Sequence, residues 1–297
     1  MEETIIEDFM ATQSLREKIQ NKINTALRLL TTRDTAASKR DKDHLLSLLD
    51  DMNAEGDIHP LWISFCSELK KDAEKWSSNS FLNWKTIRKT MAFQGIPRDK
   101  YIQLSKDPLF SKHLAEHSFG GPAASRHDRH TSDNLLHHAW SLKQISGACP
   151  LETIGSVFEF GGGYGSMARL LCKINHQINY TIYDIPFFQE LQKLYIKRVL
   201  GHSNNISWMK QINPIHVDLM LSTWGLSEAP HDLRDQIISS VTADHYLIAF
   251  QEKFEHVDNT KYFESLADSL SNKFDIDLRE IDYLPRNYYL LASRRRS

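Results

Sequence analysis

The sequence predicts an α/β protein with a seven-stranded, mostly parallel sheet that ends in an antiparallel hairpin and follows an α-helical region. From residue 155 onward, short β-type segments alternate with helical ones, a pattern typical of parallel strands joined by crossover helices. The last two β-type segments are separated by only residues 284–287, too few for a parallel crossover. Before residue 118, apolar residues recur with a helical period and no strand-like alternation is sustained.

The expected strands are short runs rich in β-branched and aromatic residues. We place them at residues 156–160, 180–183, 206–209, 217–222, 246–250, 276–282 and 288–292. The helices between most of them are expected at residues 167–174, 187–200, 231–239 and 260–273.

The amino-terminal region carries one apolar stripe formed by Leu15, Ile19, Ile23, Leu27 and Leu30, which indicates an amphipathic helix. Further helices are expected at residues 41–52, 62–69, 84–91 and 135–145.

Composition shifts divide the chain into three regions. Residues 1–117 form a helical region that could cap the site, pair two subunits as a homodimer or bind substrate. Residues 118–150 form a linker or lid and a helix, because residues 118–134 are rich in Gly, Pro, Ser, Asp and His. Residues 151–297 form the α/β domain.

The overall charge and the cysteine pattern limit the classes of partner. The net charge of −2 gives no general attraction to nucleic acid or to anionic membranes. No apolar run approaches the about 18–20 residues that a membrane span needs, and the acidic amino terminus lacks the features of a secretory signal. Cys66, Cys149 and Cys172 are widely separated, which suits a reducing compartment. We therefore expect a cytoplasmic protein without a nucleic-acid partner.

A glycine cluster follows the first expected strand, where residues 157–166 have the sequence VFEFGGGYGS. Glycines permit positive φ and close approach of a ligand, and the helix that follows presents free N–H groups. A dinucleotide fingerprint, G-x-G-x-x-G, would place its last small residue at Ser166, which fits imperfectly. The alternative spacing E-x-G-x-G-x-G is met by Glu159, Gly161, Gly163 and Gly165.

This motif closely resembles the first motif of class I S-adenosylmethionine-dependent methyltransferases, which have a Rossmann-like fold. The resemblance implies that Glu159 accepts a hydrogen bond from the methionine ammonium, directly or through water. It also implies that the following turn makes room for the cofactor, through Gly161, Gly162, Gly163, Tyr164 and Gly165.

A second acidic residue, Asp184, ends the next expected strand and could accept hydrogen bonds from the two ribose hydroxyls. Taken alone, an Asp at this point could equally be a helix N-cap. Met209 ends the third expected strand and could cover the adenine, or it could be an ordinary core residue. We also assign Ser222, at the end of the fourth expected strand, to the cofactor site.

Four segments carry a closer resemblance, namely FEFGGGYGSMARL, YDIPFFQELQKLYIKRVLG, LMLSTWGLSEAP and AFQEKFEHVDNTKYF. Together they resemble the sugar O-methyltransferase family of bacterial polysaccharide pathways over residues 118–292. The resemblance implies methyl transfer to the hydroxyl of a small-molecule or glycan acceptor.

Methyl transfer to a hydroxyl needs a base that removes the O–H proton as the new bond forms. Glu228 follows the fourth expected strand and is our first hypothesis for this base, with a helix-terminus role as the alternative. The segment also resembles plant-type small-molecule O-methyltransferases, whose histidine base follows Trp-x-Leu, but this chain has Ser227 there.

Histidines provide further hypotheses for the base. His127 and His130 lie in a polar loop, where exposed histidines without a function are also common. His137 and His138 lie on an expected helix, where neighbours point in different directions and at most one would face the site.

The acceptor is expected to contact side chains that follow strands four and five, namely Trp224, Gln251 and Asn259. We expect no metal, because no dense Asp/Asn cluster occurs and the His127–His130 pair lacks a third ligand.

Three other functions remain open on the sequence. The acceptor could be an aromatic or natural-product hydroxyl, with the amino-terminal helices forming a dimerising substrate domain. The cofactor could be NAD in an oxidoreductase, although the glycine spacing fits less well. The chain could also bind the cofactor without catalysing a reaction.

Overall fold

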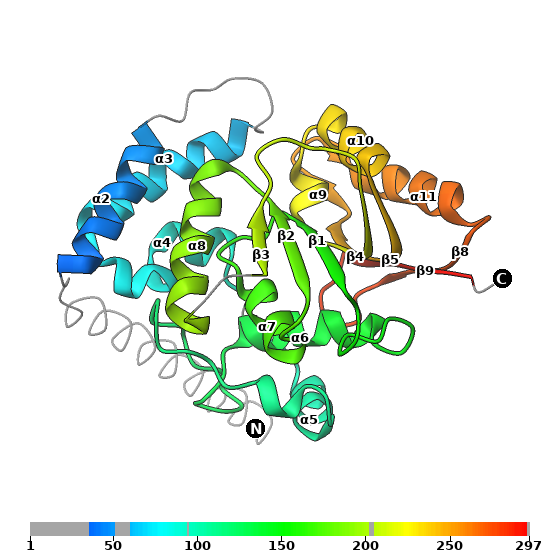
Figure 1. Cartoon of the computed structure of the whole chain (residues 1–297), viewed down its shortest axis with the longest axis horizontal. Helices are drawn as coiled ribbons and strands as arrows, with labels where there is room; N and C mark the ends of the chain where they lie inside the picture. Colours follow the sequence, from blue (N-terminus) through cyan, green and yellow to red (C-terminus); the bar gives the residue numbers. More distant parts are fainter. Residues whose placement is uncertain (1–35, 51–59, 94, 202–204, 296–297) are drawn as a thin grey trace, which may run out of the picture.

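The computed structural model describes residues 36–50, 60–93, 95–201 and 205–295. Seven strands form one sheet in the order β3-β2-β1-β4-β5-β9-β8 (Figure 1). The first five in sequence order pair in parallel, whereas β9 is antiparallel to both β5 and β8. The predicted fold class, including the carboxyl-terminal antiparallel hairpin, is therefore confirmed.

The strands of the large sheet are β1 Ser156–Phe160, β2 Asn179–Tyr183, β3 Ile206–Trp208, β4 Ile215–Thr223, β5 Val241–Gln251, β8 Phe274–Glu280 and β9 Asn287–Arg294. A separate small sheet, which the sequence did not predict, pairs β6 Lys253–Phe254 with β7 Val257–Asp258.

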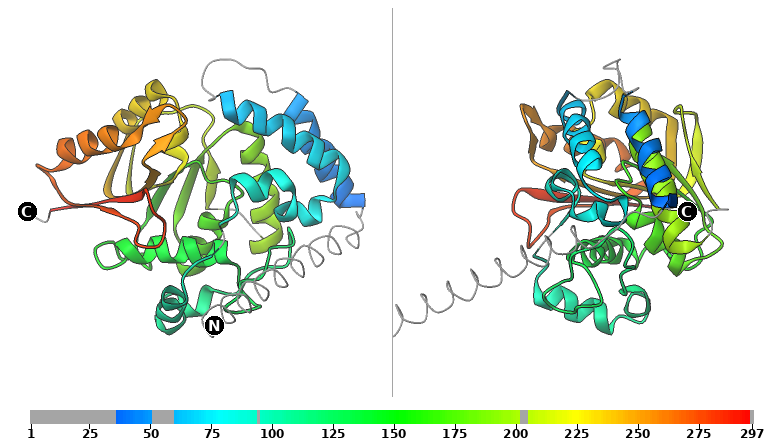
Figure 2. Two further views of the ribbon diagram at one scale, coloured as in Figure 1. Left: turned by 180° about the vertical axis from the view of Figure 1, so that it is seen from behind. Right: turned by 90° about the vertical axis from the view of Figure 1, so that its left-hand side faces the viewer.

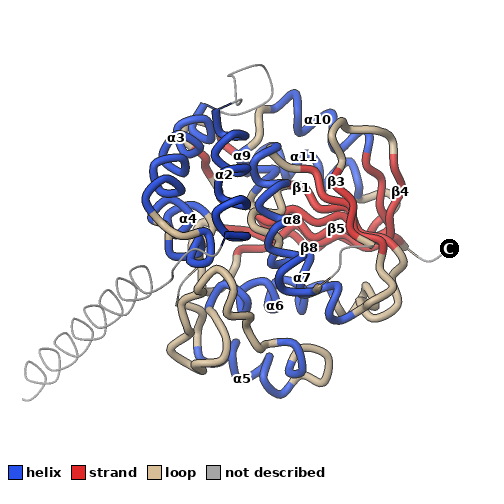
Figure 3. Tube along the Cα trace, turned by 60° about the vertical axis from the view of Figure 1, so that its left-hand side comes forward, coloured by secondary structure: helices blue, strands red, loops and turns tan. Residues whose placement is uncertain are grey.

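The helices lie on both sides of the sheet, whose strands run between them (Figure 3). They are α2 Ala36–Asp50, α3 Pro60–Lys75, α4 Lys85–Thr90, α5 Arg98–Lys106, α6 Asp133–Ile145, α7 Ser166–Ile174, α8 Pro186–Leu200, α9 Gly225–Glu228, α10 His231–Ser240 and α11 Asn259–Leu270. Two 3₁₀ helices cover Ser78–Asn83 and Ser111–His113. The apolar stripe expected at residues 15–30 lies outside the described residues.

Alternate residues of the central strands face two hydrophobic clusters, because successive strand side chains point to opposite faces. In β5, Leu247 and Ala249 join the cluster that contains the buried residues of α6, α7 and α8. Ile248 and Phe250 join the cluster that contains those of α10 and α11. Helices thus cover both faces, as a parallel sheet requires.

The described amino-terminal helices pack against the α/β part of the chain. Helices α2 and α3 lie beside α8, at the opposite end of the sheet from α11 (Figures 1 and 2). Leu69 of α3 and the fully buried Trp84 belong to the same hydrophobic cluster as α7 and α8. The three-region division of the chain stays a prediction. Among the described helices, none has the length and apolar character needed to cross a bilayer.

The strand order reverses direction at β1 and β4, which lie side by side in the sheet. Helix α7, after β1, belongs to one hydrophobic cluster, and α10, after β4, belongs to the other. The connections therefore leave in opposite directions and open a crevice at the carboxyl ends of these strands, where such folds bind ligands.

Candidate active site

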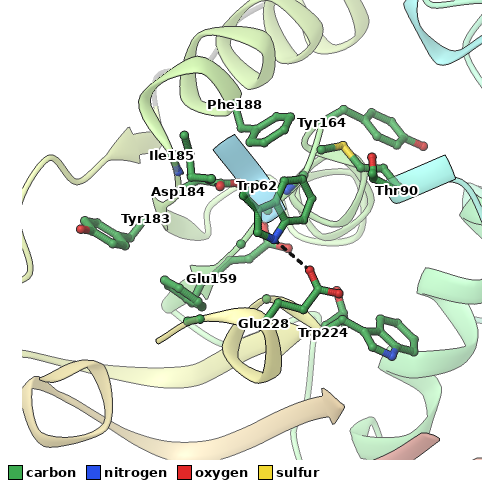
Figure 4. Close-up of a pocket in the computed structure, with 18 of the residues that line it drawn as sticks. Trp62, Thr90, Glu159, Tyr164, Tyr183, Asp184, Ile185, Phe188, Trp224 and Glu228 are labelled. Carbon is green, nitrogen blue, oxygen red and sulfur yellow. Dashed lines mark hydrogen bonds between the residues drawn. The ribbon is translucent and has the colours of Figure 1, made fainter. Parts of the chain in front are cut away.

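A cavity of about 760 Å³ lies at the carboxyl ends of β1, β2 and β4. Residues at or just beyond the ends of these strands form its walls, including Glu159, Asp184 and Trp224. Trp62 of α3 and Glu228 of α9 also line the cavity, and a hydrogen bond joins their side chains (Figure 4). The strand-end side chains are thus brought together by the parallel sheet, and the helical region completes the enclosure.

The glycine turn between β1 and α7 adopts a backbone that other residues rarely accept. Gly161, Gly163 and Gly165 have φ angles of 75°, 56° and 94°, in the left-handed region. A Cβ at Gly161 would come within 2.9 Å of the Cα of Gly225, so the turns after β1 and β4 approach closely. The nearest atom to a Cβ at Gly163 is Met91 Sδ, at 3.7 Å. The Gly163 backbone therefore lies against the cavity and leaves room for a ligand.

Glu159 lies at the base of the cavity, with a side chain that is almost fully buried. Its Oε2 accepts a hydrogen bond from the Tyr180 hydroxyl at 2.8 Å. The pKa of Glu159 is raised to about 8, chiefly by burial and to a smaller extent by the nearby Asp184 charge, while the Tyr180 hydrogen bond opposes the increase. This carboxyl would gain most from a cationic partner.

Asp184 contacts the glycine turn directly. Its Oδ2 accepts hydrogen bonds from the Gly163 N–H at 3.1 Å and from Gln192 Nε2 at 2.7 Å, while Oδ1 accepts from the Ile185 N–H at 2.8 Å. Burial raises the pKa of Asp184 to about 7, although these hydrogen bonds favour the ionised form. The two acidic positions that the sequence singled out therefore flank one turn.

Glu228 lies on the opposite wall, at the end of the short helix α9. Its Oε2 accepts from Trp62 Nε1 at 3.1 Å, and its Oε1 accepts from Gln251 Nε2 at 3.4 Å. Burial raises the pKa of Glu228 to about 7, whereas both hydrogen bonds lower it. A carboxyl that titrates near neutrality is suited to accept a proton.

The loop histidines lie elsewhere. His127 does not line the cavity; its Nε2 bonds the Ile96 carbonyl at 2.7 Å and its ring stacks on Tyr101. His130 lines a separate depression, where its Nε2 accepts from Arg129. The structure therefore does not bring either histidine to Glu228. His137 and His138 of α6 both line the cavity.

Two residues predicted to bind the cofactor, Ser222 and Met209, do not line the cavity. Ser222 is fully buried and its Oγ accepts from the Leu226 N–H at 2.8 Å. Met209 packs against the hydrophobic cluster that contains α10. Neither lines the cavity, since their side chains serve the turn after β4 and the core.

Gln251 and Asn259 also lie outside the cavity lining, in a chain of hydrogen bonds that ends at buried Arg234. Arg234 donates to Asn259 Oδ1 at 2.7 Å, and Asn259 Nδ2 donates to the Gln251 carbonyl at 3.0 Å. Their connection to the site runs through the Gln251–Glu228 bond. Gly165 is the N-cap of α7 and also lies outside the cavity lining.

The sequence analysis missed Trp62, Phe93 and Asn287, all of which line the cavity. They come from three distant parts of the chain and belong to no motif, so a local pattern could not have found them. Within the described ranges, no group of three or more His, Cys, Asp or Glu residues could hold a metal ion.

Comparison finds no protein-family model and no curated protein that matches the sequence. Solved structures with a partial likeness include the O-methyltransferase domain of StiE (residues 942–1257), at 19% identity, a TM-score of 0.39 and coverage of 50% of this chain and 70% of that one. A SAM-dependent methyltransferase from Aquifex aeolicus shares 14% identity, with a TM-score of 0.39 and coverage of 50% and 87%.

A third likeness is to the magnesium protoporphyrin IX methyltransferase ChlM from Synechocystis PCC 6803 with bound SAM. It shares 14% identity, with a TM-score of 0.42 and coverage of 68% of this chain and 100% of that one. Likeness at this level does not assign a function, which has to be argued from the cavity itself.

Proposed function

We propose that this chain is an S-adenosylmethionine-dependent O-methyltransferase that acts on a sugar hydroxyl in glycan or polysaccharide biosynthesis. One observation carries the assignment of the cofactor. The E-x-G-x-G-x-G turn and Asp184, which follows β2, meet beside the point where the strand order reverses, and the Gly163 N–H donates a hydrogen bond to Asp184. Two acids and a glycine backbone open to the cavity suit a ligand with an amino group and a ribose. The sugar acceptor is supported by the family resemblance of the sequence.

The charge of the cavity favours the sulfonium cofactor over a dinucleotide. Glu159, Asp184 and Glu228 all line the cavity and all have pKa values raised by burial. A cation would stabilise their ionised forms, whereas a pyrophosphate would add to the repulsion. Lys89, Lys193 and Lys210 also line the cavity, but Lys89 and Lys210 are exposed, and Lys193 is paired with Glu190.

When bound, S-adenosylmethionine would supply a methyl group on positively charged sulfur. On this proposal Glu159 binds the amino group of the cofactor, and Asp184 binds the ribose hydroxyls. Glu228, in its ionised form, takes the proton of the acceptor hydroxyl as the acceptor oxygen forms its bond to the methyl carbon. The C–S bond breaks in the same step, and its electron pair remains on sulfur. The apolar walls exclude water from the reacting groups.

Calorimetry tests the cofactor assignment with S-adenosylmethionine, S-adenosylhomocysteine and NAD. We expect binding of both sulfur ligands and none of NAD. Gly163→Val should abolish binding, since the side chain would enter the cavity at a left-handed φ. Gly147→Val is the matched control, because Gly147 lies outside the cavity with free space around it. Binding of NAD with no response to either sulfur ligand would reject the assignment.

The acceptor is tested by methyl transfer to a panel of nucleotide sugars and glycans, with product mass as the measurement. A mass gain of one methyl group on a sugar is the expected result. Transfer only to aromatic hydroxyls would reject the sugar as the acceptor in favour of an aromatic or natural-product hydroxyl. The cofactor assignment would be unaffected.

A further inference from the structure

One end of the cavity is built from aromatic and imidazole rings and differs from the acidic end beside the glycine turn. Its walls come from four parts of the chain: the segment after α4, helix α6, the residue before α9, and the start of β9. The side chains that line it there are Phe93, His137, His138, Trp224 and Asn287. We call these five residues the aromatic end.

Trp224 is held in an unusual backbone conformation at this end. Its φ of 67° lies in the left-handed region, which is strained for a bulky side chain. The backbone N–H donates to the Ala249 carbonyl at 2.7 Å, and the indole Nε1 donates to Asn287 Oδ1 at 2.7 Å. Both the backbone and the ring are therefore fixed, and the indole lies beside Glu228 (Figure 4). Strain of this kind is common where a side chain has to be placed for a ligand.

Three rings form a continuous wall. Phe93 stacks on His137 with centroids 3.9 Å apart and an interplanar angle of 18°, and His137 lies 5.1 Å from the Trp224 ring. Asn134 connects this wall to the glycine turn, because its Oδ1 accepts from the Phe93 N–H at 3.0 Å and its Nδ2 donates to the Tyr164 hydroxyl at 2.7 Å. The wall and the proposed cofactor turn are thus parts of one connected structure.

The two histidines each carry a buried ring nitrogen without a hydrogen-bond partner. His137 Nδ1 bonds the Tyr283 hydroxyl at 2.8 Å, which leaves Nε2 unpartnered, and in His138 the unpartnered atom is Nδ1. Burial lowers the pKa of His137 well below its usual value and that of His138 to about 4, so both rings are neutral at pH 7. Buried polar atoms without partners are uncommon, and they mark places where a ligand can supply the missing bond.

We propose that the aromatic end is the acceptor subsite, and that it takes an uncharged ring with hydroxyl groups. The ring packs against the aromatic wall, and its hydroxyls bond the imidazole nitrogens of His137 and His138. No residue of the aromatic end is charged at neutral pH, so nothing there would offset a carboxylate or phosphate on the ring. This inference rests on the proposed function for its second substrate, and either a pyranose or a catechol has the required chemistry.

Saturation-transfer NMR tests the subsite with two probes, methyl β-D-glucopyranoside and catechol, with and without S-adenosylhomocysteine. We expect transfer from the wild-type protein to at least one probe. His138→Leu should reduce the signal about fivefold, as expected for the loss of one hydrogen bond. Trp224→Gly should reduce it as well while relieving the left-handed φ. His216→Leu is the matched control, since His216 is exposed and lies outside the cavity.

The outcomes separate this inference from the proposed function. Binding of S-adenosylhomocysteine without transfer to either probe would overturn the subsite and leave the cofactor assignment in place. Equal signals from wild type and His138→Leu would also overturn it. So would a signal from methyl glucuronide, added as a charged control probe, that equals the signal from methyl β-D-glucopyranoside. If the sulfur ligand does not bind, the ligand-free arm still decides the subsite. A signal from one probe alone supports the subsite and identifies the source of the ring.

Discussion

Trp62 donates a hydrogen bond from its indole Nε1 to Glu228 Oε2 at 3.1 Å, which joins helix α3 to the turn after β4. The same indole packs edge-on against Phe188 of α8, with ring centroids 5.5 Å apart. It lies between Asp184 and Glu228 in the cavity (Figure 4). The helical region, whose role the sequence left open, therefore contributes a side chain to the candidate active site and modifies the environment of one of its acids.

Substitution Trp62→Phe should raise the pKa of Glu228. Burial already raises this pKa to about 7, and the Trp62 hydrogen bond opposes the rise by stabilising the carboxylate. If Glu228 accepts the proton, the acidic limb of the kcat/KM profile for methyl transfer should move to higher pH. Trp76→Phe, in a tryptophan outside the cavity, should leave the limb in place. A limb that does not move with Trp62→Phe would show that Glu228 does not control it.

Substitution Asp184→Ala should weaken cofactor binding while the fold survives. Losing a charged acceptor for ribose hydroxyls should cost roughly 1.5–3 kcal/mol, or about 10- to 150-fold in affinity. Calorimetry with S-adenosylhomocysteine measures the change. Asp258→Ala is a suitable control, because Asp258 caps α11 and lies outside the cavity. An unchanged dissociation constant for Asp184→Ala would mean that the residue only stabilises the turn through Gly163 and Ile185.

The elements of the sheet could be predicted because their signals are local. Strand β1 has the predicted bounds, and the glycine turn follows it as expected. Strand β5 begins at Val241, five residues before the predicted start, since α10 runs directly into it and no turn residue marks the boundary. Trp62 and Phe93 reach the cavity through long-range packing, which a single sequence does not encode as a motif. The left-handed φ of Trp224 could not be predicted from the sequence either, because glycine is the residue that signals this backbone conformation.

The stability of the ligand-free protein should fall as pH rises from about 6.5 to 8.5. A buried carboxyl with a raised pKa contributes stability that is complete below its unfolded pKa, falls as pH rises from there, and is fully lost once pH has passed its folded pKa. Glu159 titrates at about 8, and Asp184 and Glu228 at about 7. The lowered pKa values of His137 and His138 act in the opposite direction, but only below about pH 6.5.

Melting temperatures across this range measure the effect. Glu159→Gln should flatten the dependence, because the amide keeps an acceptor for the Tyr180 hydroxyl and cannot ionise. The exposed Glu264→Gln should not change it. A melting temperature that is constant or rises from pH 6.5 to 8.5 in the wild-type protein would contradict the raised pKa values.

Substitution Glu228→Gln should lower turnover strongly while leaving cofactor affinity nearly intact. Glutamine keeps the size of the side chain and can still accept from Trp62, but it cannot take a proton at neutral pH. If Glu228 is the base, kcat should fall on the order of 10²–10⁴-fold. If it only supports the turn after β4, the change should cost a few tenths of a kcal/mol in stability and little activity. His127→Gln and His130→Gln are the comparison, because both histidines lie outside the cavity and should retain activity. A comparable fall in either one would move the chemistry to the loop before α6. Full activity in all three variants would leave His137 or His138 of the aromatic end as the base, or a mechanism in which positioning of the acceptor alone suffices.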